Sequence, residues 1–226
     1  MRYTGDAYAG GVTRKFRDRE DAGNALAAAL TDVDVGNAIV LGLPRGGVPV
    51  AAVVAKALGA PLDVVVVRKV GVPGHAELAM GAIASIAGEV VTVRNESVLR
   101  GAGSDALLRF DGVAERERTE LERRQELYRA GREPLRVAGK DVILVDDGIA
   151  TGSTMRAAVL ALDSSDAASV TVAVPVGPAD TLAEFETLVD RVVCVSVPEP
   201  FWAVGQAYDD FTQTSDDEVR RMLGAG

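Results

Sequence analysis

Short runs of branched aliphatic residues alternate along this chain with stretches in which apolar residues recur every three or four positions. The short runs are bounded by turns and predict strands buried on both faces, as in a parallel sheet. The other stretches predict amphipathic helices. We expect strands at residues 38–43, 62–67, 142–145, 169–174 and 192–197, and helices at residues 20–30, 48–58, 155–162 and 180–189. The alternation predicts one α/β domain over residues 1–226, a three-layer fold with a central parallel sheet flanked by helices.

Some segments do not follow this alternation. Residues 70–79 carry glycines and a proline without an apolar stripe, which predicts a mobile loop. Residues 80–86 and 89–93 indicate two short strands joined as a hairpin. A long helix is expected at about residues 104–130, with one apolar stripe and a densely charged opposite face. That charged face is either solvated or a dimer surface.

The stretch from Val142 to Thr154 carries the clearest chemistry. Two adjacent carboxylates, Asp146 and Asp147, stand where a buried strand should end. The loop after them has two glycines and three hydroxyl residues and leads into a helix that Thr151 or Ser153 could cap. Such a loop directs backbone N–H groups and the positive end of a helix dipole toward one point, which is a phosphate site. The loop residues are Gly148, Ile149, Ala150, Thr151, Gly152, Ser153 and Thr154.

Two acids beside a phosphate loop make sense if the ligand carries hydroxyl groups next to its phosphate, because an ionised carboxylate accepts several hydrogen bonds. A ribose 5-phosphate fits, with its diol on Asp146 and Asp147. Other motifs fit poorly: Walker A needs a lysine where Ser153 stands, and the Gly-x-Gly-x-x-Gly spacing is absent. The stretch resembles the phosphoribosyl-diphosphate (PRPP) binding motif of type I phosphoribosyltransferases. Alternatively, the stretch is an ordinary strand–turn–helix whose glycine-rich turn binds no ligand.

A second loop, Pro44-Arg45-Gly46-Gly47, ends the strand expected at residues 38–43. It resembles the pyrophosphate-binding loop of the same family, especially of the xanthine-guanine type. Gly46 and Gly47 would let the backbone approach a ligand closely, and Arg45 offers a fork of donors to phosphate oxygens. In the family this loop often holds a cis peptide, which the resemblance places at Pro44–Arg45 or one residue away.

The resemblance also implies a hood over the ligand, formed by residues from about 70 to 93 and from 198 to 226. Arg68 and Lys69 end a predicted strand just before it, and both would meet pyrophosphate oxygens. Residues 70–79 would then be the catalytic loop that closes over PRPP. The roles of His75 and Glu77 in this loop stay open.

The C-terminal segment gathers four aromatic residues within eleven positions. Such a cluster either packs into the core or forms a platform for a flat base. It resembles the tail of hypoxanthine-guanine phosphoribosyltransferases, which implies that Phe201 or Trp202 stacks on the base and that Asp209 lies near the base or pyrophosphate. Those enzymes carry a lysine after the penultimate parallel strand, where this chain has residues 175–177 without a cation. The acceptor base therefore stays open.

Composition narrows the classes of function. The 226 residues are 48% hydrophobic and 25% charged, which suits a globular domain with a sizeable core. A net charge of −9 argues against nucleic-acid binding. The single cysteine, Cys194, lies among valines and indicates a core thiol. No secretory signal or membrane-spanning stretch is visible, so we expect a cytoplasmic protein without a membrane partner.

The family resemblance implies an enzyme that transfers ribose 5-phosphate from PRPP to a nitrogenous base and releases pyrophosphate. Asp146, Asp147 and Lys69 would be its catalytic residues. Mg²⁺ would be held mainly by PRPP oxygens near the two aspartates, without a dedicated protein metal site. PRPP and a base would be its small-molecule partners, and a homodimer is the expected assembly. A non-catalytic regulator that binds PRPP or a nucleotide with the same fold is the alternative.

Overall fold

The computed structural model describes residues 13–30, 33, 36–72, 75–86, 88–101, 106–163 and 165–224, with only the backbone described at residues 72, 75–79, 96 and 97. The small, polar residues that begin the sequence predict an irregular arm over residues 1–13, of which residues 1–12 lie outside the described part. Among the described helices, none is both long and apolar enough to cross a membrane.

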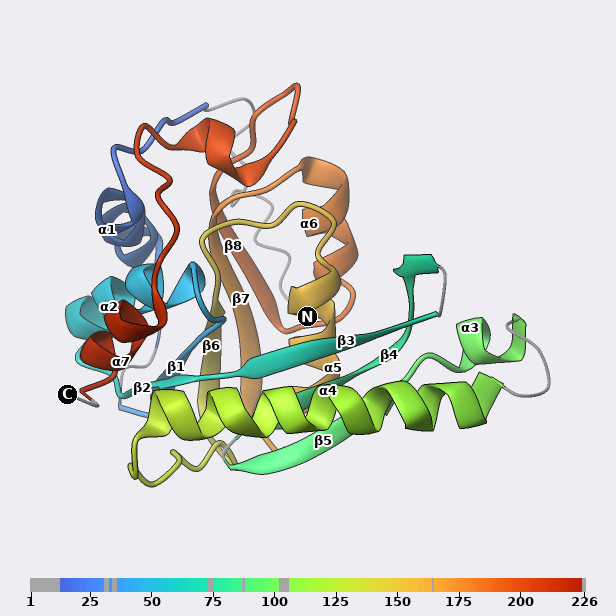
Figure 1. The fold of residues 1–226 in the computed structure, drawn as a ribbon. Helices are drawn as coiled ribbons and strands as arrows, with labels where there is room; N and C mark the ends of the chain where they lie inside the picture. Colours follow the sequence, from blue (N-terminus) through green and yellow to red (C-terminus); the bar gives the residue numbers. More distant parts are fainter. Residues whose placement is uncertain are drawn as a thin grey trace.

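A five-stranded parallel sheet forms the centre of the fold, in the order β2-β1-β6-β7-β8 (Figure 1). Its strands are β1 (Ala38–Gly42), β2 (Leu62–Val64), β6 (Asp141–Val145), β7 (Ser169–Val176) and β8 (Arg191–Ser196). The helices packed on it are α1 (Arg19–Ala29), α2 (Gly47–Leu58), α5 (Ser153–Leu162) and α6 (Ala179–Phe185). The predicted α/β architecture with a parallel sheet between helices is confirmed.

Side chains that alternate along the strands build a core on each face of this sheet. Val40, Ile143 and Val145 pack with residues of α1 and α2 on one face. Leu41 and Leu144 pack with residues of α5 and α6 on the other. Because both faces are covered, the strands consist of continuous apolar runs, which explains why the sequence pattern identified them.

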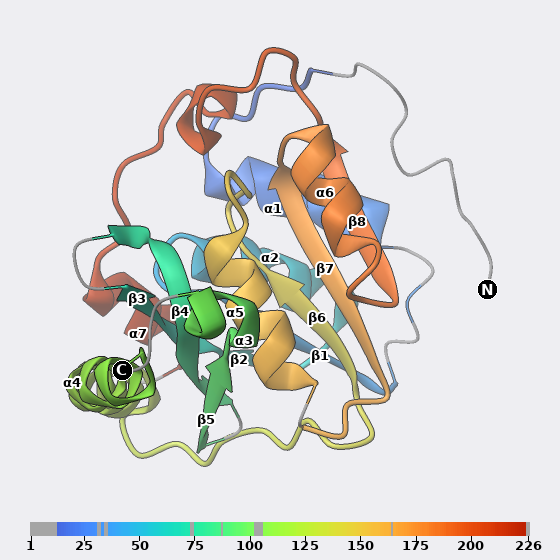
Figure 2. The ribbon, with the colours of Figure 1, turned by 90° about the vertical axis from the view of Figure 1, so that its right-hand side faces the viewer.

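A second, antiparallel sheet packs between α4 (Ala106–Arg129) and α5, in the order β3-β4-β5 (Figure 2). Its strands are β3 (Val66–Val72), β4 (His75–Ile86) and β5 (Glu89–Arg94). The predicted hairpin and long helix are confirmed. The prediction of a loop at residues 70–79 is wrong for the backbone conformation, because β3 and β4 include most of these residues. Hydrogen bonds between β3 and β4 satisfy that backbone, so no apolar stripe was needed to order it.

Two element boundaries also differ from the prediction. The strand expected at residues 62–67 divides at Val65, since β2 joins the parallel sheet while β3 joins the antiparallel one. The strand expected at residues 169–174 is longer than predicted, because β7 continues through Pro175 to Val176 where a turn was expected. β6 ends opposite Ala173, so beyond that point β7 pairs with β8 alone and a proline removes no hydrogen bond to β6.

The segments around Phe16 and Tyr208 meet over the carboxyl edge of the parallel sheet. The N–H of Phe16 donates to the Ala207 carbonyl at 2.7 Å, and the N–H of Asp209 donates to the Phe16 carbonyl at 2.8 Å. Phe16 and Tyr208 are buried together there. From this junction the C-terminal segment descends to α7 (Asp216–Met222), which packs against α2 and α4 (Figure 1). The shorter elements are α3 (Glu96–Gly101) and the 3-10 helix η1 (Val204–Ala207).

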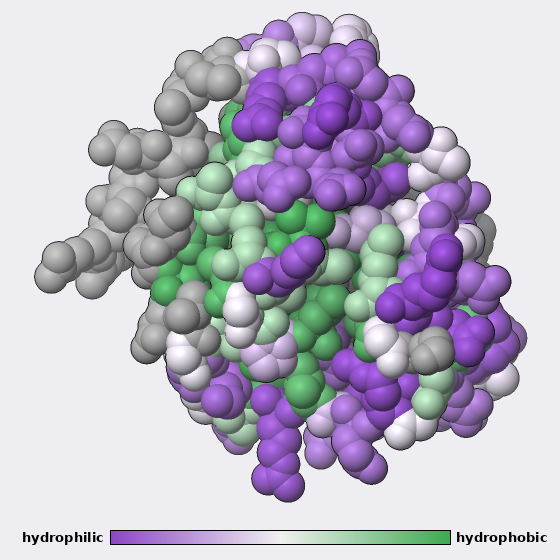
Figure 3. Space-filling model, turned by 90° about the vertical axis from the view of Figure 1, so that its left-hand side faces the viewer, coloured by the Kyte–Doolittle hydropathy of each residue, from purple (hydrophilic) through white to green (hydrophobic). Residues whose placement is uncertain are grey.

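The side of the molecule with α1, α2 and α7 shows hydrophobic residues gathered at its centre, with hydrophilic residues above and around them (Figure 3). α1 and α2 pack closely against each other on this side. A Cβ at Gly23 of α1 would lie only 2.7 Å from the Val53 Cβ of α2, so the glycine permits the two helices to approach.

Candidate functional site

The two glycine-containing loops of the sequence lie against each other. They follow β1 and β6, which are neighbouring parallel strands, so both loops emerge at the same edge of the sheet. A Cβ placed on Gly46 would lie 2.0 Å from Asp147 Oδ2, and one on Gly47 would lie 2.9 Å from Asp146 Oδ1. Real Cβ atoms do not approach so closely, so a side chain at Gly46 would displace the Asp147 carboxylate and one at Gly47 would also press on the backbone of Val145 and Asp146. The first loop is therefore shaped around the pair of acids.

The first loop also has the backbone expected from the family resemblance. The peptide bond between Pro44 and Arg45 is cis, which confirms that prediction. The N–H of Gly47 donates to the Leu43 carbonyl at 3.0 Å, and α2 begins at that glycine. Arg45 is half-buried. The N-terminus of α2 thus lies beside the two acids.

Burial and mutual repulsion dominate the electrostatics of the acid pair. Burial raises the pKa of Asp146 well above the usual range, and the charge of Asp147 raises it further. Burial also raises the pKa of Asp147, although the charge and hydrogen bonds of Arg19 oppose that rise. The N–H of Asp147 donates to Asp146 Oδ1 at 2.9 Å, which favours the ionised form. The two carboxyls are therefore unequal, because Arg19 pairs directly with Asp147 but acts on Asp146 through its charge alone.

The raised pKa predicts that Asp146 lowers the stability of the fold. An aspartate whose pKa is raised by folding costs free energy above the ordinary pKa, and the full cost applies once the pH exceeds the raised value. We expect Asp146→Asn to raise the unfolding temperature by about 2–4 °C near pH 8, for a gain of about 1 kcal/mol. The gain should shrink as the pH falls toward about 5. Thermal unfolding followed by circular dichroism measures it.

Glu122→Gln, which removes an exposed carboxylate of α4, is the matched control and should shift the unfolding temperature by no more than about one degree. An Asp146→Asn protein that unfolds at the parent temperature, or below it, would contradict the unfavourable burial of this carboxyl.

The loop after the acids has the geometry of an anion site. Gly152 has φ +70°, a left-handed conformation that favours glycine, and it forms the N-cap of α5. No side chain caps this helix, so the predicted capping by Thr151 or Ser153 is wrong. The Thr151 hydroxyl donates instead toward Ser153 Oγ at 3.5 Å. Without a capping side chain, the N–H groups of the first turn are left to a ligand or to water.

Other contacts hold that loop to the neighbouring elements. The Thr181 hydroxyl donates to the Ala150 carbonyl at 3.0 Å, and the N–H of Ile149 donates to the Val176 carbonyl at 2.8 Å. A Cβ at Gly148 would lie 2.5 Å from a methyl group of Val204. The loop is therefore fixed by α6, by β7 and by the C-terminal segment before any ligand binds.

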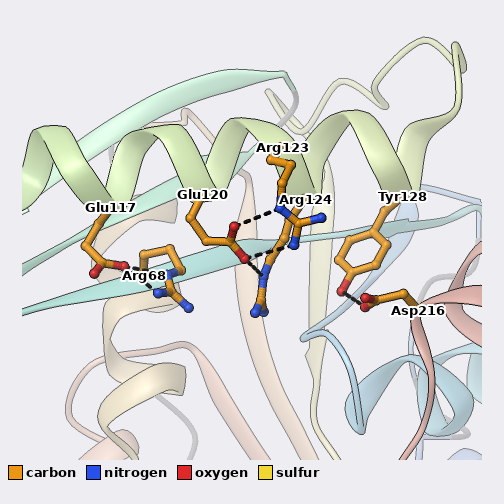
Figure 4. A network of polar contacts seen from close by, with 7 residues as sticks. All are labelled: Arg68, Glu117, Glu120, Arg123, Arg124, Tyr128 and Asp216. Carbon is orange, nitrogen blue, oxygen red and sulfur yellow. Dashed lines mark hydrogen bonds and ion pairs between the residues drawn. The ribbon is translucent and has the colours of Figure 1, made fainter.

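Arg68 and Lys69 point to opposite faces of the antiparallel sheet, because neighbouring residues of a strand alternate. Arg68 faces α4, where its Nε lies 2.6 Å from Glu117 Oε2 (Figure 4). Lys69 is half-buried on the face shared with Val65 and Val67, which pack toward α5. The sequence placed both cations on pyrophosphate, whereas the structure brings only Lys69 to the side of α5 and its phosphate loop.

The side of α4 that holds Arg68 carries a row of further polar contacts (Figure 4). Glu120 pairs with Arg123 and Arg124, which lower the pKa of that carboxyl to about 2. The Tyr128 hydroxyl donates to Asp216 of α7 at 2.6 Å, and burial together with this contact raises the pKa of the tyrosine. These contacts link the antiparallel sheet to α4 through Arg68 and Glu117, and α4 to α7 through Tyr128 and Asp216.

The predicted base-side residues occupy different environments. Phe201 packs against the buried cluster of Phe16 and Tyr208, so packing accounts for part of its role. Trp202 is 81% exposed, so core packing does not explain it. Asp209 is exposed and paired with Lys15. Of the three residues, Trp202 is the one whose ring remains available to a flat ligand.

Sequence reasoning missed two residues that contact the acid pair. The Tyr208 hydroxyl donates to the Asp147 carbonyl at 2.6 Å, and Arg19 pairs with the Asp147 carboxylate at 2.8 Å. They come from opposite ends of the chain, and neither belongs to a local motif. A cation at the first position of α1 was the one available signal, because it opposes the helix dipole.

The order of the parallel sheet places all these loops at a topological switch point. The chain passes from β1 to β2 on one side and returns on the other side as β6, and ligands of open α/β sheets bind at such a reversal. The fold thus defines an α/β protein with a candidate ligand site between β1 and β6. The phosphoribosyl transferase domain family matches residues 16–212, and the chain belongs to that family.

Known relatives agree with this membership. Two Mycobacterium tuberculosis proteins, each named "Putative phosphoribosyl transferase" (MT0597 of strain CDC 1551 and Rv0571c of strain H37Rv), are 50% identical over 208 residues. The match covers 92% of this chain and 46% of theirs, so the chain spans about half the length of these relatives. A crystal structure of TT1426 from Thermus thermophilus is 42% identical, with a TM-score of 0.82 over 92% of this chain and 97% of that one.

Proposed function

We propose that this chain transfers ribose 5-phosphate from PRPP to a nitrogenous base and releases pyrophosphate. The observation that carries the proposal is the contact between the two loops, in which Gly46 and Gly47 leave room only for the acid pair. A pyrophosphate loop and a ribose-phosphate loop must lie side by side to hold the two ends of one PRPP molecule. Family membership supports the same ligand.

Each group of site residues takes one part of PRPP in this proposal. The 5′-phosphate binds the backbone N–H groups of residues 148–154 at the N-terminus of α5. The ribose diol binds Asp146 and Asp147 as charge-assisted acceptors. Pyrophosphate binds the Arg45 loop and Lys69, while Arg68 keeps its contact with Glu117 on the far face of the sheet.

Magnesium belongs to the substrate in this scheme. The carboxylate oxygens of Asp146 and Asp147 are a ligand type that Mg²⁺ prefers, but Asp147 Oδ2 is already bound by Arg19. Among the described residues, no group of three or more His, Cys, Asp or Glu side chains could hold a metal ion. We therefore assign the ion to PRPP oxygens, where it would neutralise phosphate charge close to the acid pair.

Catalysis would come from position and charge. The bond from C1′ to the pyrophosphate oxygen breaks as C1′ gains its bond to the base nitrogen. Pyrophosphate leaves with the electron pair, and the proton of a base N–H passes to the leaving pyrophosphate or to water. Negative charge grows on that oxygen, so the Arg45 and Lys69 cations stabilise the transition state more than the bound substrate. The exposed Trp202 ring would stack on the base, and no residue here identifies which base it is.

The decisive experiment measures pyrophosphate release from PRPP and Mg²⁺ across a panel of purine and pyrimidine bases. At least one base should support release by the parent protein. An Asp146→Asn, Asp147→Asn double variant keeps the shape of the pair but loses its charge, so its PRPP affinity should fall about tenfold or more. Calorimetric binding of PRPP without release for any base would instead favour the non-catalytic regulator, and absence of PRPP binding would contradict both functions.

A further inference from the structure

Arg19 occupies a position that the helix itself disfavours. It is the first residue of α1, directly after the N-cap Asp18, whose carboxylate accepts the Asp21 N–H at 2.8 Å. The positive end of the helix dipole lies at this terminus, so acidic residues suit the first turn and a cation does not. The arginine therefore needs a partner outside the helix to be stable where it is.

That partner is the second acid of the ribose site. Arg19 Nε lies 2.9 Å and Nη2 lies 2.8 Å from Asp147 Oδ2, with the two side chains only 12% and 14% exposed. Its third nitrogen, Nη1, donates to the Thr212 carbonyl at 2.7 Å, and the guanidinium lies 4.2 Å from the centre of the Phe211 ring. All three guanidinium nitrogens are thus engaged, so the group is held in one orientation.

The oxygen bound by Arg19 is also the one that faces Gly46. Asp147 Oδ2 would lie 2.0 Å from a Cβ on that glycine, so the oxygen sits between the pyrophosphate loop and the guanidinium. The other oxygen, Oδ1, takes no part in the contact with Arg19. Arg19 acts on Asp146 through its charge alone. Arg19 therefore holds the Asp147 carboxylate in place but does not hold that of Asp146.

We propose that Arg19 is a positioning residue of the ribose site, which fixes Asp147 so that its remaining oxygen meets the ribose diol. The inference rests on the proposed PRPP binding. Arg19 acts through Asp147 and does not touch the ligand. Because Phe211 and Thr212 hold the guanidinium, the C-terminal segment takes part in forming the ribose site.

A double-mutant cycle tests the proposal with PRPP and Mg²⁺ as the ligand and calorimetry as the readout. Arg19→Met keeps the length of the side chain and removes its charge, and should weaken PRPP binding about tenfold or more. Arg19→Lys retains a charge and should recover part of the loss. In the Asp147→Asn background, Arg19→Met should have little further effect, because the carboxylate that it positions is gone.

Arg17→Met is the matched control, since it removes an exposed cation two residues away and should change the PRPP dissociation constant by less than about twofold. Unfolding temperatures of all variants show whether each one is folded. An equal loss from Arg19→Met in both backgrounds would mean that Arg19 contacts PRPP directly, which overturns the positioning role. Parent-like binding by Arg19→Met overturns it as well, whereas a parent protein without PRPP binding refutes the proposed function itself.

Discussion

Gly46→Ala should lower PRPP affinity by about a hundredfold or more while the protein still folds. The added methyl group would lie 2.0 Å from Asp147 Oδ2 and 2.7 Å from its Cγ, so the carboxylate must move. That movement separates Asp147 from Arg19 and displaces the acceptor of the ribose diol. The same methyl would stand between the two loops that PRPP must bridge. Calorimetric titration with PRPP and Mg²⁺ measures the loss, and the unfolding temperature reports on folding.

Gly112→Ala is the control for the chemical change. Gly112 lies on the exposed side of α4, where an added Cβ has no neighbour within 4 Å. The substitution should leave PRPP binding unchanged and stabilise the helix by roughly 0.5–1 kcal/mol. PRPP protection against thermal unfolding gives an independent readout, because a ligand that binds only the folded state raises its unfolding temperature. Equal protection of Gly46→Ala and the parent would show that the two loops do not share one ligand.

Much of this fold could be predicted because both faces of its parallel sheet are buried. Continuous aliphatic runs such as Val142–Val145 need a helix layer on each side, so they indicated the parallel sheet directly. The acid pair was visible for a related reason. Adjacent carboxylates after a buried strand have no packing role, so Asp146 and Asp147 pointed to a ligand.

Tertiary contacts that leave no local pattern could not be predicted. Residues 70–79 resemble a loop in composition, and only pairing with the neighbouring strand orders part of them. Arg68 and Lys69 looked equivalent, because the partner of Arg68 on α4 is distant in sequence. Arg19 is separated from Asp147 by 128 positions, so its role depends on how the two ends of the chain meet. Long-range electrostatic partners were therefore the main gap.

Side chains alternate along β3, so Lys69 faces the α5 side while Arg68 faces α4, and replacing Lys69 should have the second large effect. Lys69→Ala should reduce the turnover number by about a hundredfold and PRPP affinity by less than about tenfold. Its ammonium opposes charge that grows on pyrophosphate only as the bond to C1′ breaks, so its largest contribution falls in the transition state. Steady-state pyrophosphate release with the best base of the panel gives the turnover number. Calorimetry on the same protein gives the affinity.

Arg68→Ala separates this chemical role from a general loss of positive charge. The two residues are adjacent, but Arg68 binds Glu117 on the opposite face of the sheet, so its removal should spare turnover within about threefold. Lys56→Ala removes an exposed cation from the last turn of α2 and should leave both quantities unchanged. If Arg68→Ala slowed turnover as much as Lys69→Ala, the pyrophosphate would have to lie on the α4 side of β3. The proposed placement of pyrophosphate between the Arg45 loop and Lys69 would then be wrong.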